Sequence, residues 1–248
     1  MSRIVALMTK SFLIVFLSSG VSLLYAQRHD VGRASVMLNG PGWEPIQTQD
    51  KGVAYSGEIS GTIPSESKLF VNKSVDGQVL AIIHVRVSKG GIGQGYFTYS
   101  PTCSDKDASF AEGNKGPQAP YAQCLLVYPQ YTTVSLLAQL DASERKLIEP
   151  YSPVTPKAMR SVFAIYRNQN GSFAQVHVFM APQFVGVTAT EVNEAVDAYS
   201  LWGKALMQEV RSSVNSFSGK LNVPSMAFKS EKLVFLQEKF TVISEVSK

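Results

Sequence analysis

The feature that most constrains the fold of this chain is a change in the spacing of its apolar residues. From Thr188 to Phe217 they recur every three or four residues, the spacing that places one apolar stripe along an α-helix. Thr188 and Glu191 stand at the spacing of a capping box, and Gly219 lies just beyond the stripe. The stripe consists of Val192, Ala195, Val196, Tyr199, Trp202, Leu206, Val210, Val214 and Phe217. The pattern predicts one long amphipathic helix over about 190–217.

Upstream of this helix, residues 69–88 have the pattern of a β-hairpin. Asp76-Gly77 separates residues 69–75 from residues 78–88, and this dipeptide favours two-residue hairpin turns. Along the second arm apolar and polar side chains alternate, so one face is predicted to lie against the core. The apolar set is Ile83, Val85 and Val87, and the polar set is His84, Arg86 and Ser88.

Residues 161–180 have the pattern of a second hairpin, with its turn at residues 168–171. The second arm again alternates between two faces. The set expected to face the core is Ala174, Val176, Val178 and Met180, and the opposite set is Phe173, Gln175, His177 and Phe179.

These patterns predict an α+β protein, with a largely antiparallel β-sheet built from hairpins and packed by the long helix. Residues 124–128 predict a short buried strand. Residues 131–148 fit either a strand that runs into a helix or a helical stripe, and residues 229–248 fit helix and strand equally. The polar residues 27–34 are expected to be frayed. No linker divides residues 27–248, which are therefore expected to form a single domain.

Residues 1–26 have the composition of a secretory signal peptide. Arg3 and Lys10 accompany an uncharged, mostly apolar stretch at residues 11–24, which is short compared with the about 20 residues of a membrane-spanning helix. Ala26 suits the position before a cleavage site. We therefore expect an extracytoplasmic protein, periplasmic or secreted, that meets the membrane only transiently through this leader. The alternative is an uncleaved leader that tethers the domain.

The charge of the chain argues against nucleic acid as a partner. The sequence has 23 Lys and Arg residues against 19 Asp and Glu residues, and Arg3 and Lys10 belong to the leader, which has no acidic residue. The mature chain is therefore nearly neutral. Its basic residues are scattered, so the positive patch that binds phosphates is not predicted.

The only cysteines are Cys103 and Cys124. An isolated pair in an oxidising compartment usually forms a disulfide, and redox-active pairs normally have the much shorter Cys-x-x-Cys spacing. We expect a structural bridge that closes the loop over residues 103–124 and stabilises the fold by about 3 kcal/mol.

The chain has three histidines and no serine-hydrolase or zinc-protease motif. His29 falls in the segment expected to be frayed. His84 and His177 lie on predicted strands, each on the face opposite the core. If those strands are neighbours, the two side chains could bind a metal or share a proton with a carboxylate; otherwise they are two half-exposed residues that never meet. No metal, cofactor or catalytic residue is assigned.

Gly91, Gly93 and Gly95 belong to a glycine-rich stretch that follows Lys89. A dinucleotide-binding loop would run into a helix, whereas the aromatic residues that begin at Tyr96 are typical of a strand. The pattern therefore predicts a hairpin tip, whose exposed backbone and flanking side chains suit contact with a partner.

Two further features are candidates for recognition. Asp105 and Asp107 begin a calcium-loop spacing, but Phe110 stands where such a loop needs glycine, so we expect a solvated loop tied at its ends by the disulfide. Trp43 follows turn residues and fits either a stacking platform for a sugar or peptide or a plug at the end of a sheet.

The sequence favours an exported, non-enzymatic binding or accessory protein of the cell envelope or periplasm, with an unknown protein partner or small-molecule ligand and no cofactor. Its candidate recognition surface is Lys89, Gly91, Gly93, Gly95, Tyr96, Asp105, Asp107 and Trp43. The alternative is an envelope enzyme in which His84 or His177 acts as a general base.

Overall fold

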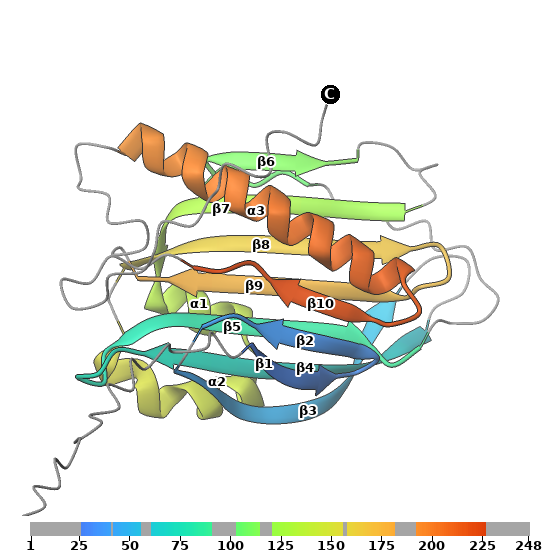
Figure 1. The fold of residues 1–248 in the computed structure, drawn as a ribbon, viewed down its shortest axis with the longest axis horizontal. Helices are drawn as coiled ribbons and strands as arrows, with labels where there is room; N and C mark the ends of the chain where they lie inside the picture. Colours follow the sequence, from blue (N-terminus) through green and yellow to red (C-terminus); the bar gives the residue numbers. More distant parts are fainter. Residues whose placement is uncertain are drawn as a thin grey trace, which may run out of the picture.

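The computed structural model describes residues 26–40, 42–55, 61–90, 103–114, 121–155, 158–181 and 192–226. Within these ranges the chain forms two β-sheets with helices packed on them (Figure 1). Several predictions lie outside the described residues: the leader, the glycine-rich tip with its aromatic arm, the capping box at Thr188 and Glu191, and the tail from residue 229.

The larger sheet is antiparallel throughout and confirms the predicted α+β class. Its seven strands run in the order β3 (Trp43–Tyr55), β4 (Gly61–Lys73), β5 (Val79–Ser88), β9 (Phe173–Met180), β8 (Ala158–Asn168), β7 (Tyr121–Thr132) and β6 (Phe110–Gly113). The two predicted hairpins are β4–β5 and β8–β9. They meet through pairing of β5 with β9, a contact between segments far apart in the sequence.

The turn of the first hairpin is longer than the predicted two residues. The ladder stops at the pairing of Lys73 with Val79, after a register shift. Ser74 then organises the turn, because its backbone N–H donates to the Gln78 carbonyl (2.9 Å) and its Oγ accepts from the Gln78 N–H (3.0 Å). Gly77 has a φ of 81°, which a residue with a side chain rarely adopts. Side-chain hydrogen bonding by Ser74 thus competes with further strand pairing.

The smaller sheet corrects the expectation that residues 27–34 are frayed. It has the order β1 (Gln27–Val31), β2 (Ala34–Leu38) and β10 (Lys220–Val223), with β10 parallel to β2. Val31, Ala34, Val36 and Leu38 are buried. Their alternation places one face of this short hairpin on the core, which outweighs the polar composition of the segment. The strand β10 was not predicted.

One face of the large sheet is crossed by α3 (Val192–Asn215), which lies beside the smaller sheet (Figure 1). The predicted stripe is buried from Tyr199 to Val214, which confirms the helix. Phe217 is exposed, because the helix ends before it and the chain turns at Gly219, whose φ is 56°. A Cβ on Gly219 would lie 2.3 Å from the Arg33 carbonyl oxygen, so this turn needs glycine.

The opposite face carries α1 (Thr133–Gln139) and α2 (Ala142–Ile148), which lie behind the sheet in Figure 1. The short 3-10 helix η1 (Glu149–Val154) follows α2 directly. Residues 131–148 are thus the end of a strand followed by two helices. Leu136, Leu140 and Ile148 are buried in a second apolar core with residues of the sheet. The large sheet is therefore covered on both faces.

Candidate functional site

The structure brings His84 and His177 together. His84 on β5 is the direct register partner of His177 on β9, so the two strands that carry them are neighbours. Each histidine is only 4% exposed. The expectation of half-exposed side chains is wrong, because α1 and α2 cover this face of the sheet.

The carboxylate that completes the cluster is Glu144 of α2. Its Oε1 lies 3.1 Å from His84 Nε2 and 3.5 Å from Arg86 Nη2, and it accepts a hydrogen bond from Ser67 Oγ at 2.8 Å. Its Oε2 accepts from the backbone N–H of Asp141 at 3.2 Å. Glu144 is 1% exposed, so both oxygens of a buried carboxylate have partners.

Local sequence explains why Glu144 stands at the start of α2. Asp141 is the N-cap, and its carboxylate accepts from the backbone N–H groups of Ser143 and Glu144 at 3.0 Å each. Together with the return bond from Glu144, this is a capping box. The spacing of Asp141 and Glu144 is a signal that sequence analysis missed. It marks a helix start, but it does not show that the carboxylate faces two histidines.

His177 has different partners from His84. Its Nε2 lies 2.6 Å from Ser161 Oγ, and its ring packs against Phe179 with centroids 4.0 Å apart. Burial, with a smaller contribution from the neighbouring His84, lowers the pKa of His177 to about 3. His177 is therefore neutral at neutral pH.

The cluster contains two kinds of residue pair that occur in catalytic triads, a carboxylate with a histidine and a serine with a histidine. In a triad both pairs share one histidine, whereas here each pair has its own. A carboxylate orients one imidazole (Glu144 and His84), and a hydroxyl contacts the other (Ser161 and His177). Ser161 is 0% exposed, so no substrate reaches its hydroxyl in this conformation. In the described parts of the chain, no three His, Cys, Asp or Glu side chains are grouped to hold a metal ion.

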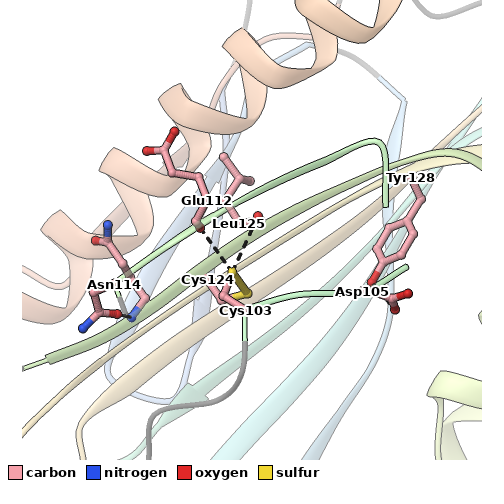
Figure 2. Close-up of a disulfide and its surroundings, with 8 residues drawn as sticks. Cys103, Asp105, Glu112, Asn114, Cys124, Leu125 and Tyr128 are labelled. Carbon is pink, nitrogen blue, oxygen red and sulfur yellow. Dashed lines mark hydrogen bonds between the residues drawn. A yellow bond between two sulfur atoms is a disulfide. The ribbon is translucent and has the colours of Figure 1, made fainter. Parts of the chain in front are cut away.

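The predicted disulfide between Cys103 and Cys124 is present, with a Cα–Cα distance of 5.2 Å (Figure 2). The disulfide ties the beginning of the segment between the cysteines to Cys124 of β7. The strand β6 then pairs antiparallel with β7, which places Gly113 opposite Cys124. A Cβ on Gly113 would lie 2.6 Å from the Cβ of Cys103, so the bridge requires glycine there. The segment between the cysteines thus includes an edge strand that was not predicted.

Asp105 and Asp107 are exposed on the loop that the disulfide holds. Asp105 Oδ1 accepts from the Asp107 backbone N–H (2.9 Å), and Asp105 Oδ2 accepts from the Tyr128 hydroxyl (3.0 Å; Figure 2). At another strand end, exposed Lys89 pairs with Asp50, with Nζ 2.6 Å from Oδ1. The other predicted tip residues, Gly91, Gly93, Gly95 and Tyr96, lie outside the described residues.

The structure decides between the two interpretations of Trp43 and corrects the expectation for His29. Trp43 is 6% exposed, belongs to the core, and donates through Nε1 to the Asn39 carbonyl (3.2 Å). It plugs the beginning of β3 and offers no ring face to a ligand. His29 is not in a frayed segment: it lies on β1 and packs on Phe70, with ring centroids 4.9 Å apart.

Fold and site together define a disulfide-bridged α+β protein with a buried polar cluster under α2. Comparison of the chain with protein-family models, curated proteins and solved structures gives no significant match. Across the described ranges, no helix has both the length and the hydropathy needed to cross a membrane.

Proposed function

We propose that this is an exported, non-enzymatic binding or accessory protein of the cell envelope or periplasm. The observation that supports the proposal is the burial of its chemically capable side chains. Ser161, His177 and Glu144 are all at most 4% exposed. A general base or nucleophile has to reach the atoms of a substrate, whereas Ser161 and His177 contact each other, and Glu144 bonds to His84, Ser67 and the Asp141 backbone.

The cysteine bridge supports the proposed compartment, because disulfides persist in oxidising environments. The leader at residues 1–26 supports it independently. Intact-mass measurement and N-terminal sequencing of protein from its own cells test both. We expect an N-terminus near Gln27 and a mass about two units below that of the reduced chain. A retained leader or free thiols would contradict the proposal.

The loop at residues 103–109 is the part of the proposed recognition surface that the structure describes best. Beside the disulfide, its backbone is held by Ala108 N–H donating to the Asp105 carbonyl (3.2 Å) and Ser109 N–H donating to the Val127 carbonyl (2.8 Å). A loop that is already ordered loses less conformational freedom when it binds. Its exposed carboxylates at Asp105 and Asp107 favour a partner with basic groups.

A photo-crosslinking amino acid at position 107 tests this surface in cells. We expect a defined adduct with one partner from Asp107, and none from the same substitution at Leu201, an exposed position on α3. Equal adducts at both positions, or none at either, would count against the loop as the binding surface.

One observation favours the enzyme alternative, namely the 2.6 Å contact between Ser161 Oγ and His177 Nε2. If the α1–α2 side opened to a substrate, His177 would act as base and Ser161 as nucleophile. A fluorophosphonate probe distinguishes the two functions. The binding proposal expects no labelling of Ser161, whereas labelling that His177→Gln abolishes would establish the alternative.

A further inference from the structure

Glu144 is the point at which α2 is joined to the sheet by polar contacts. Its carboxylate accepts from Ser67 of β4 and contacts His84 and Arg86 of β5, while its other oxygen completes the capping box of α2. Loss of the carboxylate contacts would weaken both the helix start and its attachment. The helix itself has seven residues, too few to be stable without packing.

Glu144 is the one negative charge that offsets the basic groups described in this cluster. It is the only buried carboxylate among the described residues, and it already faces Arg86 and His84. His177 stands directly beside His84 across the β5–β9 pairing. A proton added to His177 therefore places a further positive charge in the cluster with no second buried carboxylate to offset it.

The elements that pack on this side of the sheet carry other charged and titratable groups. They are Lys73 of β4, Tyr128 of β7, Arg167 of β8, Asp141, Arg145 and Lys146 of α2, and Glu149 and Tyr151 of η1. Asp141, Arg145, Lys146 and Glu149 are exposed, Tyr128 donates to Asp105, and Lys73 pairs with Glu44. The sequence of α1 contains no ionisable side chain.

We propose that the chain of contacts from Glu144 through His84 and His177 to Ser161 is an acid-sensitive latch, which holds α1 and α2 on the sheet at neutral pH and releases them on acidification. Protonation of His177 adds charge beside His84 and removes the ring nitrogen lone pair that is able to accept the Ser161 hydroxyl. Opening of the α1–α2 side lets water solvate the added charge. This inference is independent of the proposed function.

Hydrogen–deuterium exchange of the intact, disulfide-bonded protein tests the latch. Protection factors, corrected for the pH dependence of chemical exchange, are compared between about pH 7 and about pH 5 for peptides of residues 133–155 and of α3. We expect protection at residues 133–155 to fall about tenfold more than protection of α3, because an exposed His177 takes up a proton in this interval. An equal change in both regions would overturn the proposal.

His177→Gln keeps a polar group near Ser161 but does not take up a proton, so it should abolish the extra acid response at residues 133–155. His29→Gln is the matched control, because His29 is a partly buried histidine on the other side of the sheet, and it should leave the response unchanged. If His177→Gln does not fold, Ser161→Ala serves instead and should shift the response to higher pH. A response that is unchanged in the histidine variant, or in the serine variant, would refute the latch.

Discussion

The two faces of the large sheet are covered by different kinds of contact. On the α3 face, Tyr199, Trp202, Leu206 and Val210 pack on the apolar side of the sheet in a continuous core. On the α1–α2 face, an apolar core surrounds a buried polar cluster centred on Glu144. Apolar burial is non-directional and tolerates small shifts, whereas the polar cluster needs every partner in place. The comparison teaches that the second face depends on individual polar contacts, so it is the more sensitive of the two to the loss of a single partner and to pH.

The lengths of the helices agree with this difference. The helix α3 has 24 residues and presents a long apolar stripe to the sheet, while α1 and α2 have seven residues each. Short helices are marginal on their own, so α1 and α2 depend on their caps and on docking. We therefore expect variants on the α3 face to act through lost apolar area and variants on the other face to act through unpaired polar groups.

The largest effect should come from Trp202→Ala on the α3 face. The side chain is fully buried and donates through Nε1 to the Ser225 carbonyl (3.2 Å), so its loss leaves a large cavity. We expect the free energy of unfolding to fall by about 4 kcal/mol in equilibrium urea denaturation. Leu201→Ala on the same helix, at a position 61% exposed, should cost about 0.5 kcal/mol or less. Comparable losses in the two variants would contradict this description of the face.

Glu144→Ala should be the most damaging single change on the other face. It leaves His84, Arg86 and Ser67 without their common acceptor, and breaking a buried ion pair costs about 3 kcal/mol. Urea denaturation measures the loss, with exposed Glu149→Ala as the control. A loss below about 1 kcal/mol would mean that the polar cluster contributes little to stability.

The α1–α2 face should also make the stability of the protein depend on pH, because it contains His177. The pKa of His177 is about 3 in the folded protein, against 6.5 for an ordinary histidine. Between these values the unfolded chain binds a proton that the folded protein does not, so the free energy of unfolding falls as the pH falls, by at most about 1.4 kcal/mol per pH unit. Denaturation curves at several pH values should show this slope. We expect His177→Gln to reduce it, and an equal slope in the variant would contradict the assignment.

The smallest effect is expected for Ser161→Ala, which removes the hydroxyl 2.6 Å from His177 Nε2 and changes little volume. The cost should be about 1 kcal/mol in the same denaturation assay, because a buried hydrogen-bonding group loses its partner. Ser212→Ala on the exposed side of α3 is the control and should be neutral. No difference between the two serines would indicate that the Ser161 contact is energetically negligible.

Elements defined by local periodicity were predicted from the sequence with good accuracy. The strand arms around residues 74–78 and 169–172 and the buried stripe of α3 depend on residues that are close together along the chain. The prediction failed where local composition was outweighed by distant packing. Residues 27–34 are polar overall, yet the alternate apolar residues of β1 and β2 are buried against the core.

Little of the candidate site could be predicted from the sequence, because its residues are brought together by tertiary structure. The sequence correctly separated the face that carries His84 and His177 from the face that carries Val85 and Val176, because side chains alternate strictly along a strand. It did not predict that the histidine face also carries an apolar core. Whether the two histidines meet depends on the order of the strands, and their burial depends on α1 and α2 covering that face. Glu144 lies 60 residues from His84 along the chain, and no spacing rule relates them.

The sequence by itself determined the α+β class, the two hairpins, the long helix and the cysteine bridge, since each depends on local period or on an unambiguous pairing. Only the tertiary structure decided that β5 pairs with β9 and that α2 delivers Glu144 to a pair of histidines. The physical reason is that the backbone of any one strand can form hydrogen bonds with many other strands, and its apolar face can pack in many arrangements, so local sequence does not select one strand order. The order is selected by the packing of the whole core, in which contacts between distant segments are satisfied together.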